Sequence, residues 1–155
     1  MKKTNLLTEL KTKPNIEKRI FAGIIDYLII SIFFFIFLFY FGEPDAEGEL
    51  AVSGLPVLIP ILFWGIMTIG LEIGLGATLG NSLVGLKAIP INGTNRKLTF
   101  GESLKRHLLD QIDMFFFGLV GIITIKNTEK NQRIGDLWAK TIVVTNKSLT
   151  ELKTE

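Results

Sequence analysis

The chain has no cysteine and a single histidine among its 155 residues, and these shortages narrow the chemistry open to it. Without cysteine there is no disulfide framework, thiol nucleophile or cysteine metal site. His107 stands beside Arg106 without a clear second ligand, so we expect no metal site. A nucleophile, a base and an oxyanion donor cannot be assembled together either. We therefore expect no catalytic residues, no cofactor and no enzymatic activity.

Charge is nearly missing from two long stretches. Residues 20–41 carry Asp26 as their only charge, and residues 55–71 carry none. A membrane-spanning helix needs about 20 mostly apolar residues, whereas the apolar region of a cleavable signal peptide has only about 7 to 15. The chain is 48% hydrophobic with a mean hydropathy of +0.40. We predict an all-α membrane protein whose full transmembrane helices cover about 20–41 and 55–75.

Basic residues are missing from one further segment. Residues 42–54 carry four acidic residues and no basic one, whereas residues 1–19 carry six Lys or Arg. Cytoplasmic segments are enriched in Lys and Arg, so we expect a protein of the cytoplasmic membrane with its N-terminus in the cytoplasm. We divide the chain into a flexible basic tail (1–15), a membrane domain (16–145) and a polar C-terminal tail (146–155).

A third apolar segment, at about 104–125, is too short for an ordinary crossing. Its uncharged part, 114–125, has only 12 residues. The segments before and after it carry five and six basic residues, over 75–106 and 126–155, so both ends are expected in the cytoplasm. We predict a re-entrant helical segment, with Ser103 as the N-cap of its helix. A third complete span is the alternative.

A small β element is predicted on the cytoplasmic side. Residues 86–91 and 141–145 have strand-like composition and can pair only if both lie on one side of the membrane. Asn92–Gly93 is a strong hairpin signal, with residues 96–100 as the return strand.

Several charged residues fall at membrane depth. Arg106, Asp110 and Asp113 share one helix face, and an unpaired charge at such depth costs at least ~2.5 kcal/mol. Arg19 and Asp26 share another face, roughly 10 Å apart along the axis, with small residues between them that allow a neighbouring helix to approach. We predict a charge cluster, structural or ion-binding, made of Arg19, Asp26, Glu72, Arg106, Asp110, Asp113, Arg133 and Asp136.

Within this cluster we expect Arg106 to pair with Asp26, and Arg19 with Asp136. Two members have alternatives. Arg19 fits a headgroup anchor as well as an ion pair, and Glu72 fits a side chain that reaches headgroup water slightly better than one in the interior.

Four sequence blocks in order resemble the RDD family of bacterial membrane proteins. The blocks are RIFAGIID, LEIGLGATLGNSLVGLKAIPINGT, the arginine of LKRHLLDQID, and NQRIGDLWAKTIVV. The family is named for one arginine and two aspartates, and the resemblance points to Arg19, Asp26 and Asp136. It covers roughly residues 16–145. Many members read TxGK where this chain ends the motif with Asn81, so the resemblance implies that a basic contact is missing here.

The resemblance implies a membrane protein whose molecular function is mostly unassigned, although transport has been suggested for the family. One hypothesis is transport of an ion or small solute by an oligomer, with Asp26 as the carboxylate that binds a proton or cation. The alternative is a membrane scaffold or assembly subunit in which the Arg and Asp pairs only fix helix packing. Expected partners are the bilayer, with anionic lipid at its cytoplasmic face, and a second copy or another membrane protein. We expect no nucleic-acid binding.

Overall fold

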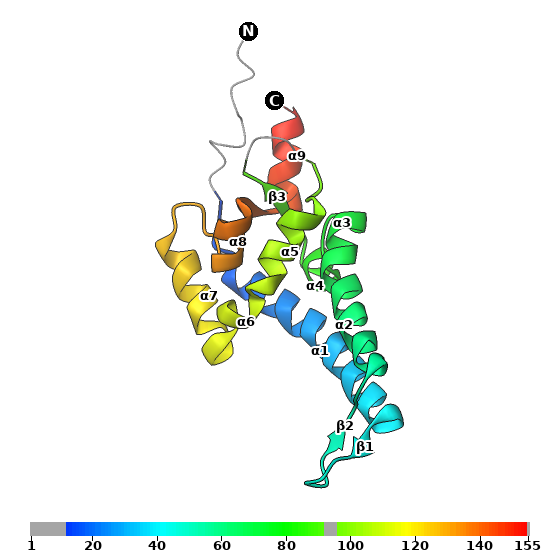
Figure 1. Ribbon diagram of the computed structural model, residues 1–155. Coiled ribbons are helices and arrows are strands. Elements are labelled where there is room, and N and C mark those ends of the chain that lie inside the picture. The colour runs from blue at the N-terminus through cyan, green and yellow to red at the C-terminus, as the bar shows by residue number, and fades with distance from the viewer. Residues whose placement is uncertain (1–11, 92–95, 155) are drawn as a thin grey trace.

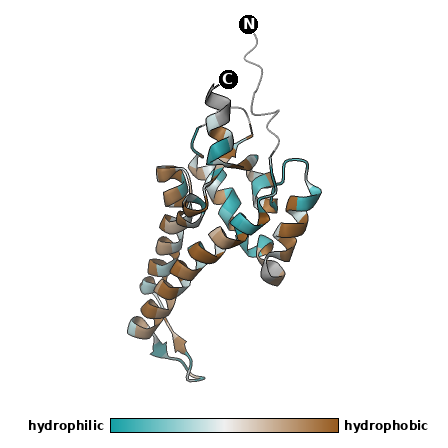
Figure 2. Cartoon of the chain, turned by 180° about the vertical axis from the view of Figure 1, so that it is seen from behind, coloured by the Kyte–Doolittle hydropathy of each residue, from teal (hydrophilic) through white to brown (hydrophobic). Residues whose placement is uncertain are grey.

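The computed structural model describes residues 12–91 and 96–154. The predicted turn at Asn92–Gly93, and the predicted tail up to residue 11, lie outside these residues. Two long helical segments run side by side with a small hairpin at one of their ends, and the rest of the chain packs around their other ends (Figure 1). Hydrophobic residues cover the long helices, and hydrophilic residues gather near the packed end (Figure 2).

The first predicted span is confirmed as α1, Ile16–Phe41. Its 26 residues reach about 39 Å, which exceeds the thickness of a bilayer core. Only three of its residues are buried inside the protein: Ala22, Asp26 and Phe37. The exposed apolar surface of α1 is what a helix facing lipid requires, because hydrocarbon takes the place of a protein core there.

The second predicted span is confirmed as one continuous helical segment from Leu55 to Leu75. It consists of four consecutive pieces: η1 (Leu55–Val57), α2 (Leu58–Gly65), the π-helical η2 (Ile66–Gly70) and α3 (Leu71–Leu75). Pro56 and Pro60 lie in its first turns, where a missing amide donor does least harm. The hairpin that joins the two spans pairs β1 (Glu43–Pro44) with β2 (Leu50–Ala51). The sequence analysis did not predict this hairpin.

A short helix, α4 (Leu79–Leu83), packs directly on α1. Gly76 ends the preceding helix with a φ of 92°, and the Thr78 hydroxyl caps α4 by accepting a hydrogen bond from the Asn81 amide. A Cβ atom on Gly80 would lie 2.1 Å from the carbonyl oxygen of Ala22. The two helices touch backbone to backbone, as the small residues of α1 predicted.

The predicted strand pair is confirmed. β3 (Leu86–Pro90) and β4 (Thr141–Thr145) are antiparallel, with Leu86 opposite Thr145 and Pro90 opposite Thr141. Both faces of this pair are covered, and the buried residues on the two faces are Ile89, Ile142, Val144 and Leu149 on one, and Leu86, Ala88, Leu98 and Val143 on the other. Leu149 comes from α9 (Asn146–Thr154), a helix formed by the segment assigned to the polar C-terminal tail.

The predicted return strand over 96–100 is wrong. A capping box between Thr99 and Glu102 starts a helix at Phe100, and the position of Thr99 shows that the prediction of Ser103 as N-cap is also wrong. Ser103 is a buried residue inside that helix. The edge of β3 is occupied by β4 from the distant C-terminal region.

The third apolar segment is sharply bent. α5 (Phe100–Leu108) and α6 (Asp110–Asp113) precede α7 (Phe115–Asn127), and the axes of Phe100–Asp113 and Gly118–Asn127 differ by 114°. The bend contains Phe116 and Gly118, whose φ angles are 49° and 83°. This is the geometry of a broken span or a re-entrant segment. The chain then forms α8 (Ile134–Ala139), which packs on α5.

Candidate functional site: a buried charge cluster beside a pocket

Nine ionisable side chains converge where α1, α3, α5, α6 and α8 meet. They are Arg19, Asp26, Glu72, Arg106, His107, Asp110, Asp113, Arg133 and Asp136, which we call the charge cluster. All but Arg19 and Arg133 are buried. The cluster contains every residue that the sequence analysis predicted for it, and His107 in addition.

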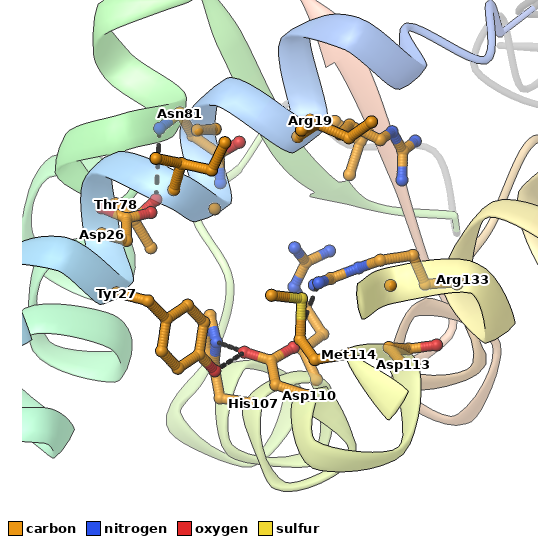
Figure 3. Close-up of a pocket in the computed structure, with 18 of the residues that line it drawn as sticks. Arg19, Asp26, Tyr27, Thr78, Asn81, His107, Asp110, Asp113, Met114 and Arg133 are labelled. Atoms are coloured by element: carbon orange, nitrogen blue, oxygen red, sulfur yellow. Dashed lines mark hydrogen bonds and ion pairs between the residues drawn. The ribbon is translucent and has the colours of Figure 1, made fainter. Parts of the chain in front are cut away.

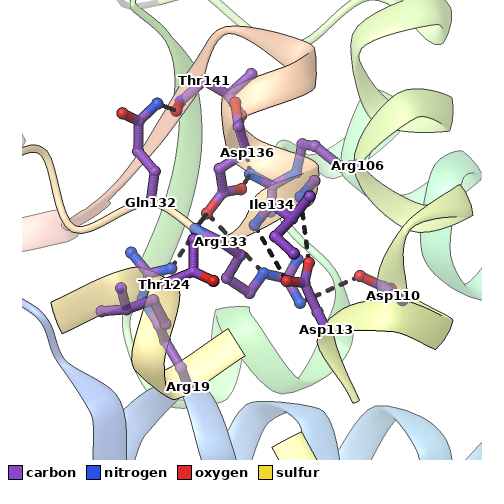
Figure 4. A network of polar contacts seen from close by, with 12 residues as sticks. Arg19, Arg106, Asp110, Asp113, Thr124, Gln132, Arg133, Ile134, Asp136 and Thr141 are labelled. Atoms are coloured by element: carbon purple, nitrogen blue, oxygen red, sulfur yellow. Dashed lines mark hydrogen bonds and ion pairs between the residues drawn. The ribbon is translucent and has the colours of Figure 1, made fainter. Parts of the chain in front are cut away.

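Asp136 is the centre of the arginine contacts (Figure 4). Arg19 Nη1 lies 3.2 Å from its carboxylate, Arg106 donates to the same carboxylate, and the backbone amide of Arg133 donates at 3.0 Å. The predicted pair of Arg19 and Asp136 is confirmed. Burial alone would raise the pKa of Asp136, but the three neighbouring guanidinium groups hold that pKa well below its ordinary value.

A glycine lets α8 bring Asp136 into the cluster. A Cβ atom on Gly135 would lie 2.5 Å from the carbonyl oxygen of Arg106, so only glycine allows α8 and α5 to approach so closely. Arg106 also donates to the Thr141 hydroxyl at 3.2 Å, which ties the cluster to the first residue of β4. The Arg106 side chain is 1% exposed, and both of its ion-pair partners, Glu72 and Asp136, are buried within the protein.

Glu72 lies in the interior, and the prediction that it reaches headgroup water is wrong. Its carboxylate accepts a hydrogen bond from the Ser103 hydroxyl at 2.6 Å and lies 3.4 Å from Arg106 Nε. His107 Nε2 is also 3.4 Å from Glu72. Three residues of α5, Ser103, Arg106 and His107, therefore contact the Glu72 carboxylate of α3.

His107 links Glu72 to the next acid of the cluster, Asp110. Its Nδ1 lies 2.8 Å from Asp110, which also accepts a hydrogen bond from Tyr27 at 3.2 Å and pairs with Arg133 at 3.1 Å. The sequence analysis did not include His107 in the cluster. The spacing of His107 and Asp110 at i and i+3 was a signal that the two side chains meet.

Asp113 is bound mainly by backbone. Its two carboxylate oxygens accept hydrogen bonds from the amides of Ile134 at 3.0 Å and Gly135 at 3.2 Å. The face shared by Arg106, Asp110 and Asp113 is confirmed as a buried polar face. It holds the first turn of α8 in place.

Asp26 is bound differently from the other acids, and the predicted pair with Arg106 is wrong. The Asp26 carboxylate accepts a hydrogen bond from the Gly80 amide at 2.7 Å and another from the Thr78 hydroxyl. Among the described residues, no cation lies within ion-pair distance of it. Arg106 is committed to Glu72 and Asp136, and the close approach of α4 supplies neutral donors to Asp26 instead. The motif Thr78-Leu79-Gly80-Asn81 was the sequence signal for these donors.

A pocket of about 350 Å³ lies between α1 and the α5–α7 segment (Figure 3). Asp26, Tyr27 and Arg19 line it from α1, and His107, Asp110, Asp113 and Arg133 line it from the other side. Asn81 lies at the end of the pocket near Thr78 and Asp26. The remaining lining is mostly apolar. The pocket therefore joins the charge cluster to the hydrocarbon-like surface of the protein.

The cluster contains more acids than bases. Its five carboxyl groups face three guanidinium groups and one imidazole, which leaves two negative charges if every acid is ionised, or one if His107 is protonated. Asp26 and Asp113 are the two carboxyl groups whose hydrogen-bond donors are neutral, and among the described residues neither has a cation at ion-pair distance. A proton or a bound cation at one of them would balance the remaining negative charge.

Comparison with protein-family models gives a match to the RDD family over residues 13–140. The chain belongs to the RDD family. The match covers most of the chain and confirms the resemblance seen in the four sequence blocks. No curated protein and no solved structure matches the chain. Family membership and the two apolar helices make this RDD protein a membrane protein. Of the three residues to which the resemblance pointed, Arg19 and Asp136 form an ion pair, whereas Asp26 is bound by Gly80 and Thr78.

Proposed function

We propose that this RDD protein moves protons, or exchanges a proton for a small monovalent cation, across the cytoplasmic membrane, and that Asp26 is the carboxylate that carries the ion. The observation that carries the proposal is the surroundings of Asp26. This side chain is 7% exposed, lines the pocket, and has only neutral donors as partners among the described residues. A buried carboxyl group in that position binds a proton or a cation.

The excess of acids in the charge cluster supports the same proposal. Asp136 has three arginine partners, so the uncompensated charge falls on the carboxyl groups that have neutral donors, Asp26 and Asp113, and both line the pocket. Asn81 occupies the place where many family members have lysine, and it lines the pocket near Asp26. An uncharged residue there leaves the site open to an exchangeable ion.

The orientation follows from charge. The six basic residues before α1 favour a cytoplasmic N-terminus, and the acidic hairpin between the spans then lies outside. Two spans and one bent segment enclose little volume for an alternating-access path. Transport would therefore require an oligomer.

The test is flux in proteoliposomes that contain a pH-sensitive dye. Wild-type protein should dissipate a pH gradient when Na⁺, K⁺ or Li⁺ is supplied. Asp26→Asn should reduce the flux to that of protein-free liposomes while keeping its oligomer size, because an amide cannot exchange a proton. Glu47→Gln is the matched control, since it removes an exposed acid from the β1–β2 hairpin. Folded Asp26→Asn protein that transports like the wild type would contradict the proposal, as would wild-type protein that transports with none of the cations.

A scaffold function is the second candidate, and the closed bonding of Glu72, Arg106 and Asp136 favours it. These groups form ion pairs with one another inside the protein, and each is at most 1% exposed. Paired buried charges of this kind fix helix positions. In this case Asp26→Asn would lower stability or alter association with a membrane-protein partner, and the proteoliposomes would show no flux with any variant.

A further inference from the structure

The mouth of the pocket opens on the apolar surface of the protein. Ile20 and Ile24 of α1 line the pocket and are 44% and 54% exposed, and Met114, on the opposite side, lines it and is 42% exposed. Apolar side chains that are both at a pocket and on a membrane-spanning surface border the bilayer. Molecules that enter this pocket sideways therefore come from the lipid phase.

The polar end of the pocket offers an unused donor. Arg19 Nε is buried and has no hydrogen-bond partner among the described residues, although the other nitrogens of this guanidinium bind Asp136 and the backbone of Asn131. The Arg19 side chain is 9% exposed and lines the pocket. A buried guanidinium N–H without an acceptor is costly, and a phosphate oxygen is a suitable acceptor for it.

The same pocket offers an unused acceptor one to two helical turns away. Asp26 has no cationic partner among the described residues, and Asp110 lies on the facing wall. Arg19 and Asp26 lie about two helical turns apart on α1, and both line the pocket. A ligand that carries an anionic group and a cationic group can therefore contact both side chains.

We propose that this pocket binds one zwitterionic phospholipid with a primary amine, its phosphate against Arg19 and its ammonium group against Asp26, with the acyl chains leaving between Ile20, Ile24 and Met114. The volume of about 350 Å³ suits a headgroup and the first part of the chains. The ammonium group supplies the positive charge that the cluster lacks. Lipid binding and ion exchange would compete for Asp26, but lipid retention is measured without flux, so the failure of one can be told apart from the failure of the other.

A substitution at Gly23 can fill the pocket without changing a residue of the charge cluster. Gly23 lines it between Arg19 and Asp26, and a Cβ atom added there meets nothing within 4 Å. Gly23→Leu therefore places a side chain in the pocket without disturbing the cluster. Gly65→Leu is the matched control, because a Cβ atom at Gly65 also meets nothing within 4 Å and Gly65 does not line the pocket.

The experiment is native mass spectrometry of protein equilibrated with phosphatidylethanolamine or phosphatidylglycerol. Wild type and Gly65→Leu should retain one phosphatidylethanolamine per chain and hold phosphatidylglycerol about tenfold less well, because the latter lacks the charge-assisted contact to Asp26. Gly23→Leu should lose the adduct. Asn81→Lys should also lose it, because the lysine ammonium competes for Asp26, whereas Ser82→Lys on the exposed side of α4 should not.

Two results would overturn the proposal. Equal retention of the two lipids would remove the role of the amine, and a phosphatidylethanolamine adduct that survives in folded Gly23→Leu would place the lipid elsewhere.

Discussion

At the scale of single residues, the carboxyl groups of the charge cluster divide into those with a cationic partner and those, Asp26 and Asp113, with neutral hydrogen-bond donors. Asp136 has three arginines around it, while Asp26 has a backbone amide and a hydroxyl. Removing one member of a buried ion pair leaves the other unpaired, which is costly, whereas removing a charge that has no counter-charge is much cheaper. Neutralising Asp136 should therefore cost more stability than neutralising Asp26.

Neutralising Asp136 should destabilise the protein by about 3 to 5 kcal/mol at neutral pH, because three guanidinium groups lose their common partner. The pKa of Asp136 is depressed in the folded protein, so its contribution is present above the unfolded pKa of about 4 and is lost as pH falls further. Thermal unfolding in detergent should show that the difference in stability between wild type and Asp136→Asn becomes smaller below about pH 4. A constant difference down to pH 2 would contradict this assignment.

Gly80 should tolerate no side chain. A Cβ atom there would lie 2.1 Å from the carbonyl oxygen of Ala22, so Gly80→Ala must push α4 away from α1. We expect a loss of about 1 to 3 kcal/mol, the usual cost of overpacking, measured by thermal unfolding. Gly65→Ala is the control, since its Cβ atom meets no neighbour within 4 Å. Equal stability of the two variants would show that α4 does not pack on α1 in this way.

The residue types of the cluster were readable from the sequence, but most partners were not. Charges in apolar segments are costly unless they find polar partners, which identified the members from Arg19 to Asp113, and the family resemblance added Arg133. The partner of Arg106 depends on how closely α8 approaches α5, which is decided by Gly135, and the partner of Asp26 depends on α4. Spacing along one helix shows which side chains share a face. It does not show which distant element covers that face.

At the scale of elements, long apolar runs and strand-like composition explain the correct predictions, and an overlooked helix start explains the wrong return strand. The two spans and the strand pair followed from long apolar runs and from strand-like composition, which are strong signals. The return strand failed because residues 96–100 contain a helix start that was overlooked. Thr99 and Glu102 form a capping box, and Arg96 pairs with Glu102 at 2.7 Å. The local pattern Thr-x-x-Glu was present in the sequence.

The cap at Thr99 should contribute to the stability of α5. Its hydroxyl accepts a hydrogen bond from the Glu102 amide, and α5 carries Ser103, Arg106 and His107 into the cluster. We expect Thr99→Ala to lower the free energy of unfolding by about 0.5 to 2 kcal/mol, measured by thermal denaturation. Thr99→Ser should retain most of the stability that the cap contributes. If Thr99→Ser loses as much as Thr99→Ala, the hydroxyl is not the source of the effect.

At the scale of the whole molecule, the chain builds a polar interior next to the bilayer with very few elements. The bent segment, the strand pair and α8 all pack at one end of the two spans and bring distant charges together there (Figure 1). The 12-residue apolar run predicted a bend, and the 114° angle agrees with it. The pocket was not predictable, because it depends on the space left between α1 and α7.

The central claim is that Asp26 exchanges a proton for a cation, and proton release tests it most directly. Purified protein in a weakly buffered solution with a pH indicator receives Na⁺, K⁺ or Li⁺ as the chloride salt. Wild-type protein and Glu47→Gln should release about one proton per chain with at least one cation, because binding of the cation displaces the proton from the uncompensated carboxyl group. Asp26→Asn should release none. Equal release from wild type and Asp26→Asn, or no release from either with any cation, would contradict the account.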